Sequence, residues 1–313
     1  MTDAAAIRDR LQNLPTPTLK QLFDADPQRL SALTGRIGWG EGETAGSILF
    51  DWSKTHLDEV HMGAFEELAD AMDFAGRRDV LLTGGIANPT EGRAAEHTAQ
   101  RGVGKDSSVE EAMALHQRMK LLVEAIRAGE LGEVKHLIHI GIGGSALGPA
   151  CALAMLARDI DAPLIDVHVV SNIDGCALED AMHACDPKTT MIAVASKTFT
   201  TIETMTNAES ALDWLKENGV SDPYGRVVAL TASPEKAVEW GVDETRVLPF
   251  SETVGGRYSL WSSIGFPVAI ALGWDEFEAM LAGAQAVDIH FRDTDARANL
   301  PLRAAFADQL YTR

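Results

Sequence analysis

Two loops rich in glycine and hydroxyl side chains carry the residue types best suited to bind a phosphate group. They are residues 141–145 and 196–201. A phosphate needs several converging hydrogen-bond donors, and glycine lets backbone N–H groups approach it closely. Lys197 adds the one full positive charge within these two loops. The predicted phosphate-binding residues are Gly144, Ser145, Ser196, Lys197, Thr198 and Thr201.

The elements that must position these loops are a strand before each loop and a helix after it. Short apolar runs at residues 136–140 and 190–195 predict buried strands. Segments of helical character follow at residues 146–157 and 202–215. The amino-terminal end of a helix favours an anion, and open α/β sheets bind ligands at the carboxyl ends of their strands. This arrangement predicts one phosphate site that both loops share.

Five such apolar runs alternate with helical patterns. Alternation of this kind predicts an α/β fold with a doubly wound parallel sheet of about five strands, covered by helices on both faces. In the flavodoxin-like order 2-1-3-4-5, the first and third strands are neighbours, so their two loops should face one ligand. The predicted strands are residues 136–140, 166–171, 190–195, 226–231 and 246–250.

We expect three regions along the chain. Residues 1–107 should form a helical and irregular amino-terminal segment, with a turn or hairpin at the glycine-rich residues 35–46. Residues 108–291 should form the α/β domain that binds phosphate, and residues 292–313 should begin a second, truncated domain.

Helical periodicity predicts several further helices. Ser108 and Glu111 have the spacing of a capping box at the start of a long amphipathic helix. The other helical patterns are at residues 57–74, 260–272, 276–291 and 303–310.

The composition excludes several classes of protein. The 313 residues are 46% hydrophobic, but no apolar stretch approaches the ~20 residues that span a bilayer. The first ten residues lack the pattern of a secretory signal, so we expect a cytoplasmic protein with no membrane partner. A formal net charge of −19 repels polyanions, and no basic run points to nucleic acid. The chain has only three cysteines, and none of them are in CxxC spacing. This pattern argues against both a disulfide framework and a cysteine-rich zinc site.

A dinucleotide site is the main alternative for the first loop. Gly141, Gly143 and Ala146 formally match the G-x-G-x-x-G/A fingerprint. An acid that binds ribose would be expected near the end of the second strand, where the chain has Ser171 and Asn172. The Walker A pattern is absent as well, which argues against a nucleotide triphosphatase.

Arg257 is the candidate catalytic residue, because it lies beside two glycines in the segment after the last predicted strand. A guanidinium stays charged and offers a planar fork of donors, so it could stabilise an oxyanion that develops during a reaction. The alternative is a buried structural ion pair.

The chain resembles the glucose-6-phosphate isomerase family from about residue 15 to its end. Six motifs occur here in the order of that family, and the last of them is among the most specific. These motifs are residues 51–54, residues 88–93 with His97 and Arg101, and residues 141–149, 171–175, 196–203 and 255–265.

The resemblance implies two sugar-isomerase domains, each an α/β/α sandwich, in a homodimer whose active site lies between domains and subunits. It implies the interconversion of glucose 6-phosphate and fructose 6-phosphate through a cis-enediolate, with no metal or organic cofactor. By motif matching, Gly144, Ser145 and the loop 196–201 would hold the sugar phosphate, and Arg257 would lie beside the reacting carbons.

The resemblance also leaves some catalytic roles without a residue. The catalytic glutamate of the family, its ring-opening histidine and its carboxy-terminal lysine have no counterpart in this sequence, so we assign none of them. Glu203 is interpreted as a first-turn acid of a helix. Nothing in the sequence places a histidine near Arg257, and we interpret four of them as structural or surface residues: His97, His116, His139 and His168. A non-catalytic sugar-phosphate sensor and a nicotinamide-dependent oxidoreductase remain alternative functions.

Overall fold

The structure is a computed structural model that describes residues 3–42, 45–156 and 164–312. The chain divides into two units, residues 93–281 and residues 1–92 together with 282–313. Each unit has its own buried apolar side chains. No helix in the described part of the chain is long and apolar enough to cross a membrane.

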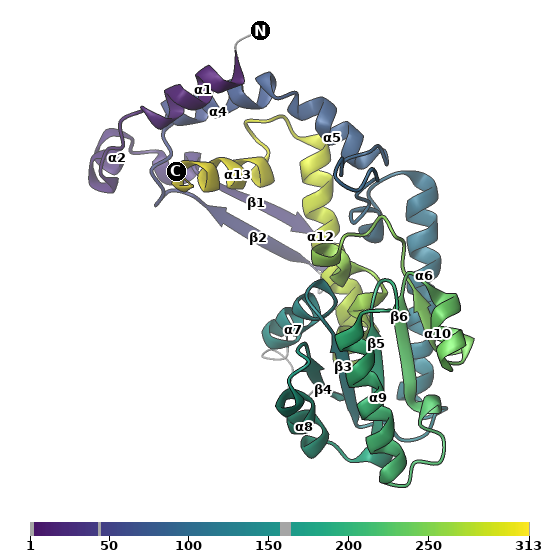
Figure 1. Ribbon diagram of the computed structural model, residues 1–313. Coiled ribbons are helices and arrows are strands. Elements are labelled where there is room, and N and C mark those ends of the chain that lie inside the picture. Colours follow the sequence, from purple (N-terminus) through teal and green to yellow (C-terminus); the bar gives the residue numbers. More distant parts are fainter. Residues whose placement is uncertain (1–2, 43–44, 157–163, 313) are drawn as a thin grey trace. The chain divides into compact units, whose positions relative to one another are not determined.

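The larger unit, residues 93–281, is built on a five-stranded parallel sheet (Figure 1). The strand order is β4-β3-β5-β6-β7, which is the predicted order 2-1-3-4-5. This sheet confirms the predicted α/β fold class. Each observed strand lies within a residue or two of the apolar run that predicted it. The strands are β3 (His136–Gly141), β4 (Asp166–Val170), β5 (Thr190–Ala195), β6 (Val227–Thr231) and β7 (Val247–Pro249).

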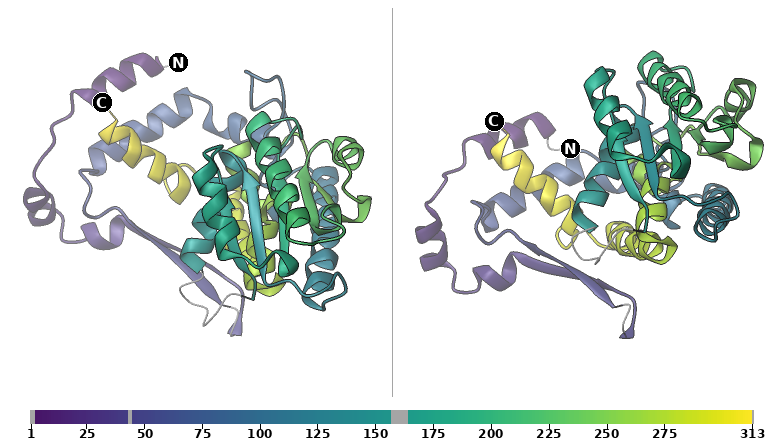
Figure 2. Two further views of the ribbon diagram at one scale, coloured as in Figure 1. Left: turned by 60° about the horizontal axis from the view of Figure 1, so that its bottom comes forward. Right: turned by 90° about the horizontal axis from the view of Figure 1, so that it is seen from below.

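Helices cover both faces of this sheet (Figure 2). Successive strand residues point to opposite faces, and apolar residues on each face need a layer of helices to bury them. Leu137 packs with residues of α6, α7 and α11, whereas Ile138 packs with residues of α8, α9 and α10. The sheet is therefore the middle layer of an α/β/α sandwich. The helices are α6 (Asp106–Arg127), α7 (Gly144–Leu156), α8 (Gly175–Ala184), α9 (Ile202–Glu217), α10 (Pro234–Trp240), α11 (Phe266–Leu272) and α12 (Trp274–Asp293).

Short 3₁₀ helices complete the larger unit. Two of them, η6 and η7, replace the first half of the single helix predicted over residues 260–272. A Cβ on Gly265 would lie 2.3 Å from the Phe277 ring, so this position tolerates no side chain. Pro267 then starts α11, because it suits a first turn and cannot continue a helix. The 3₁₀ helices are η2 (Ala99–Arg101), η3 (Pro187–Thr189), η4 (Tyr224–Arg226), η5 (Glu244–Arg246), η6 (Gly256–Trp261) and η7 (Ser263–Gly265).

The capping box predicted for the long helix α6 is wrong. This helix begins at Asp106, with Lys105 at its N-cap and no side-chain cap. Ser108 lies inside the first turn instead, and its hydroxyl donates to the Glu96 carboxylate at 2.6 Å. The contact that determines the role of Ser108 comes from a segment outside the helix, which the local spacing does not show.

The smaller unit, residues 1–92 with 282–313, holds an antiparallel hairpin and short helices (Figure 1). The pairing of β1 with β2 confirms the hairpin that was one of the two expectations for the glycine-rich segment 35–46. The core of the smaller unit includes Phe65, whose ring stacks on that of Phe306 with centroids 4.7 Å apart. Its elements are α1 (Ala4–Gln12), α2 (Leu19–Ala25), α3 (Arg29–Ala32), β1 (Thr34–Trp39), β2 (Gly46–Asp51), α4 (Glu59–Ala71), α5 (Phe74–Leu82) and α13 (Leu300–Tyr311).

The unit boundaries differ from the expected domain boundaries. Residues 93–107 belong to the same unit as the sheet, and residues 292–313 pack with the amino-terminal segment. These units describe packing within this chain. The second domain expected to begin at residue 292 therefore stays a prediction.

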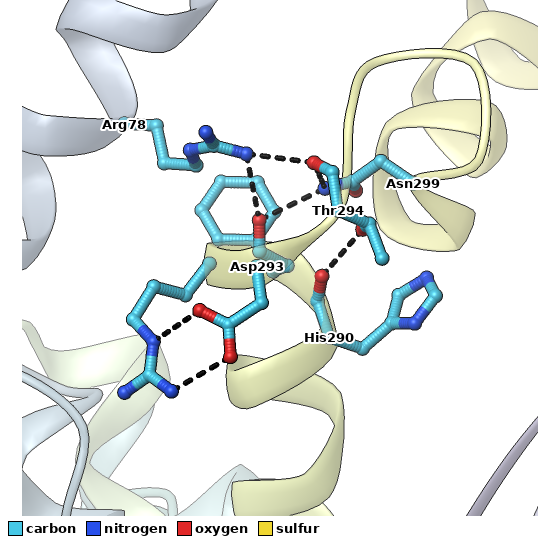
Figure 3. Close-up of polar contacts among 7 residues, drawn as sticks. Arg78, His290, Asp293, Thr294 and Asn299 are labelled. Atoms are coloured by element: carbon cyan, nitrogen blue, oxygen red, sulfur yellow. Dashed lines mark hydrogen bonds and ion pairs between the residues drawn. The ribbon is translucent and has the colours of Figure 1, made fainter.

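The carboxyl end of α12 is tied to two other elements of the smaller unit (Figure 3). Arg78 of α5 donates to the carbonyls of Phe291 and Thr294, at 3.2 and 2.8 Å. The side-chain amide of Asn299 donates to the same two carbonyls, at 2.9 and 3.4 Å. Its oxygen caps α13 by accepting from the backbone N–H of Leu302. Residues far apart in the sequence thus satisfy carbonyls that a helix end leaves unpaired.

Arg29 is a buried cation that joins α3 to residues 53–57 of the smaller unit. Its guanidinium donates to the carbonyls of Ser53 at 2.8 Å, Leu57 at 2.7 Å and Thr55. Burial lowers the pKa of this guanidinium from its ordinary value. Three carbonyls that point at one fork of N–H groups compensate for removing the charge from water.

Replacing Arg29 by lysine is expected to lower the free energy of unfolding by about 2 kcal/mol, because an ammonium cannot reach three carbonyls at the corners of a planar fork. Urea unfolding checks this prediction. The Arg77→Lys variant, which changes an exposed side chain of α5, should unfold like the unmodified chain. Equal midpoints for the two variants would contradict the assigned role.

Candidate functional site

The two predicted phosphate loops leave neighbouring strands at one edge of the sheet. β3 and β5 pair in parallel, and their last residues, Gly141 and Ala195, are register partners. Residues 142–143 lead from β3 into α7, and residues 196–201 lead from β5 into α9. Two helix amino termini therefore begin at this edge, where their unpaired N–H groups favour an anion.

The first loop turns sharply into α7. Gly143 has a φ of +60°, a conformation that glycine adopts without strain. Gly144 and Ser145 then occupy the first two positions of the helix. The backbone N–H groups at the start of a helix lack acceptors in the preceding turn of that helix. That of Ser145 donates to the carbonyl oxygen of Ile142 in the loop, at a long 3.3 Å. Both residues thus lie at the amino-terminal end of α7, and their role in phosphate binding stays a prediction.

His139 holds the end of the first loop through a hydrogen bond to its backbone. This β3 side chain is fully buried, and its Nε2 lies 2.7 Å from the carbonyl oxygen of Ser145. Burial lowers the pKa of His139 to about 4, so the imidazole is neutral near pH 7 and donates a hydrogen bond from Nε2. The histidine therefore positions Ser145 without adding charge to the site.

The buried His139 predicts a pH dependence of stability. Its folded pKa of about 4 lies below the ordinary value of 6.5. Between these values the unfolded chain binds more protons, so stability is complete above pH 6.5 and falls as the pH drops towards 4. We expect His139→Gln to remove about 3 kcal/mol of the loss between pH 7 and pH 4. Urea unfolding at several pH values measures it, with the exposed His183→Gln as control. An unchanged pH profile in His139→Gln would contradict this account.

The second loop gathers hydroxyl groups. Ser196 and Thr201 lie 3.0 Å apart between their side-chain oxygens, and the Thr198 and Thr200 hydroxyls lie 2.8 Å apart. Phe199 has a φ of +52°, which is unusual for a residue with a side chain. Its buried ring packs edge-on against Trp240. This anchor holds the backbone in a strained turn that leaves Thr198 exposed.

Lys197 connects the second loop to the segment after β7. Its Nζ donates to the carbonyl oxygen of Glu252 at 2.7 Å. Arg257 lies in η6 of the same segment, and its side chain is exposed. Within the described residues, its guanidinium has no hydrogen bond or ion pair. The described residues therefore give Arg257 no buried ion pair, and its role towards a ligand stays a prediction.

The Arg257 segment packs directly on the first loop. A Cβ on Gly144 would lie 2.2 Å from the carbonyl carbon of Gly256 and 2.3 Å from its oxygen. The Ser259 hydroxyl donates to the carbonyls of Gly256 at 2.7 Å and Gly144 at 3.3 Å. The structure therefore brings the backbone next to Arg257 against the helix end that carries Gly144 and Ser145.

Two side chains of the segment 97–101 pack on the neighbours of Arg257 in η6. The His97 ring stacks on Tyr258 at 4.6 Å, and the Arg101 guanidinium lies 4.8 Å from the Trp261 ring centroid. Burial, together with Arg101, lowers the pKa of His97 to about 4, so this ring is neutral near pH 7. The sequence placed no histidine near Arg257, whereas the structure stacks the His97 ring on Tyr258, the next residue in the chain. Only the motif match joined these segments, which lie far apart in the sequence.

The structure gives no support to a dinucleotide at the first loop. Asp174 lies close to where an acid for ribose would be needed, but its carboxylate caps α8 by accepting from the backbone N–H of Cys176 at 2.9 Å. The Asn172 carbonyl accepts from the amide of Asn207 at 2.8 Å. Glu203 is exposed in the first turn of α9, as interpreted from the sequence.

Comparisons with known proteins give a consistent result. A family model described as "Phosphoglucose isomerase" matches residues 51–313. The chain is 69% identical over 309 residues to a protein of Erythrobacter litoralis named "Glucose-6-phosphate isomerase", which covers 97% of this chain and 59% of that protein. It is 67% identical over 303 residues to a protein of the same name from Novosphingobium aromaticivorans, with 97% of this chain and 58% of that one covered.

A solved structure matches the fold as well. A glucose-6-phosphate isomerase from Chlamydia trachomatis superposes with a TM-score of 0.80 at 23% identity, covering 98% of this chain and 59% of that one. At this identity the match concerns the fold alone. The chain thus spans between half and two thirds of the length of these proteins.

Proposed function

Because the chain belongs to the phosphoglucose isomerase family, we propose that it carries the sugar-phosphate site of an isomerase that interconverts glucose 6-phosphate and fructose 6-phosphate. The observation that carries this proposal is the close approach of Gly256 to Gly144. It puts the Arg257 segment beside the first loop, and the hydrogen bond from Lys197 to the Glu252 carbonyl joins the same segment to the second loop. These contacts support a role for Arg257 next to a bound sugar phosphate.

The proposed roles follow from the chemistry of the reaction. Gly144, Ser145 and the hydroxyls of Ser196, Thr198 and Thr201 bind the phosphate, and Lys197 adds positive charge. Binding there holds the carbon atoms C1 and C2 in place, so that binding energy becomes positioning. A carboxylate base, which we assign to no residue here, removes the proton from one carbon and returns it to the other. Arg257 stabilises the negative oxygen of the cis-enediolate between these steps.

The intact protein is proposed to act as a cytoplasmic homodimer and to need neither a metal nor an organic cofactor for this reaction. The substrate itself is the small-molecule partner. No role for nucleic acid or a membrane is proposed.

Proton NMR of fructose 6-phosphate in deuterated water tests the proposal. The chain is extended by the remaining part of the Erythrobacter litoralis relative, about two fifths of that protein, since 59% of it is covered here. Glucose 6-phosphate should appear, with deuterium incorporated at the exchanging carbon. Binding without turnover or exchange in this extended chain would support a sugar-phosphate sensor instead. The absence of both binding and turnover would refute the proposal.

A further inference from the structure

A second cluster of chemically reactive side chains lies towards the amino-terminal ends of the strands, whereas the phosphate loops lie at their carboxyl ends. His136 is the first residue of β3 and His168 lies in β4, whereas Cys185 follows the last residue of α8. One ligand atom from each of the three lies within 4.8 Å of the others. His136 begins the same strand that ends at Gly141, so the cluster is about 17 Å from the first loop, at about 3.3 Å per residue.

The strand register explains why these side chains meet. His136 pairs with Asp166, and Ile138 pairs with His168. Because alternate strand residues share a face, both histidines and Asp166 lie on the face that Ile138 also occupies. Cys185 packs in the same apolar cluster as Ile138. The fold, and not local sequence spacing, therefore assembles two imidazoles, a thiol and a carboxylate.

Two imidazole nitrogens of this cluster are buried without a hydrogen bond. They are Nδ1 of His136 and Nε2 of His168, and neither has a partner of acceptable geometry among the described residues. Asp166 Oδ2 lies 3.2 Å from His168 Nε2, but that contact lacks the direction of a hydrogen bond. A buried nitrogen without a partner is costly and calls for a water or an ion.

We propose that His136, His168 and Cys185 bind a zinc ion, with Asp166 as the fourth ligand. Imidazole nitrogen, thiolate sulfur and carboxylate oxygen are the ligands that Zn²⁺ takes in proteins, and in a tetrahedral site they lie about 3.3–3.8 Å apart. The ligand atoms of His136, His168 and Cys185 lie up to 4.8 Å apart and must approach by about 1–1.5 Å. The exposed Asp166 carboxylate lies outside this group of three and must move further. Binding replaces the thiol proton of Cys185 by the metal. The ion would join β3, β4 and the end of α8, a structural role away from the substrate.

Titration with Co²⁺ tests this proposal, because a tetrahedral cobalt site with a thiolate ligand has a sulfur-to-metal charge-transfer band and intense visible bands. The 313-residue chain is used without a polyhistidine tag, after treatment with a chelator. One equivalent of Co²⁺ should produce both bands, and Zn²⁺ should abolish them by displacement. Zinc at about a hundred times its Kd should also raise Tm by about 5 °C.

Matched variants identify the ligands. Cys185→Ser should lose the charge-transfer band, and His168→Gln should lose tetrahedral binding. Cys176→Ser and His183→Gln change exposed residues of α8 and should keep both bands. Circular dichroism and fructose 6-phosphate binding show whether each variant is folded. The binding assay also reports on the proposed function independently of the metal. Absence of the bands in the unmodified chain, or their persistence in Cys185→Ser, would overturn the proposed zinc site.

Discussion

Replacing Gly144 by alanine is expected to weaken binding of fructose 6-phosphate at least tenfold and to slow isomerisation about a hundredfold. The added Cβ would lie 2.2 Å from the carbonyl carbon of Gly256. Both neighbours are backbone, so no side-chain rotation relieves the clash, and the two segments must separate by about an ångström. A displacement of this size at a catalytic group costs about a hundredfold in rate.

Isothermal titration of the 313-residue chain with fructose 6-phosphate measures the binding part of this prediction. The matched control is Gly175→Ala, because a Cβ on Gly175 meets nothing within 4 Å and this glycine also stands at the first position of a helix. Only Gly144→Ala should weaken binding. If its affinity equalled that of the control, the close contact between the two segments would not position the site.

Arg257→Ala is expected to lower kcat by about 10²–10³-fold, the usual cost of removing a donor that stabilises an oxyanion. KM should change little, because the phosphate is bound by other residues. Arg257→Lys should recover only part of the rate, since a compact ammonium does not reproduce the planar fork of donors. The experiment uses the chain extended with the remaining part of its Erythrobacter litoralis relative.

Steady-state kinetics separate this role from simple substrate binding. Added guanidinium ion should restore part of the activity of Arg257→Ala, and it should not change Arg77→Ala, in which an exposed arginine of α5 is removed. A raised KM with unchanged kcat would mean that Arg257 binds the ground state and does not stabilise the enediolate.

The architecture of the sheet could be predicted from the sequence because its strands are short apolar runs buried on both faces. Residues 190–195, for example, are buried along their whole length and form a strand with the predicted bounds. The break before α11 could not be predicted from periodicity alone, because the apolar pattern runs on through Gly265 and Pro267, at which the new helix starts. The close contact between Gly265 and the Phe277 ring is equally invisible in the local sequence. The role of Ser108 inside α6 depends on a contact with Glu96, which lies outside the helix.

The candidate site was predictable in its residue types and only partly in its assembly. Strand order predicted that the loops after β3 and β5 would be neighbours. Nothing local indicated that Lys197 reaches the Glu252 carbonyl, or that His97 stacks on Tyr258. Such contacts join segments that are distant in the sequence, and they depend on side-chain packing that hydrophobic periodicity does not encode.

The most direct test of the central claim is phosphorus NMR of fructose 6-phosphate with the 313-residue chain, compared with its Ser145→Ala/Thr201→Ala double variant. We expect the unmodified chain to broaden the phosphate signal, and the double variant to bind at least about thirtyfold more weakly, because two hydrogen bonds to a charged group are lost. The control Thr206→Ala/Ser210→Ala, which changes exposed hydroxyls of α9, should bind normally. Equal binding by all three proteins would contradict the claim that these two loops hold the sugar phosphate.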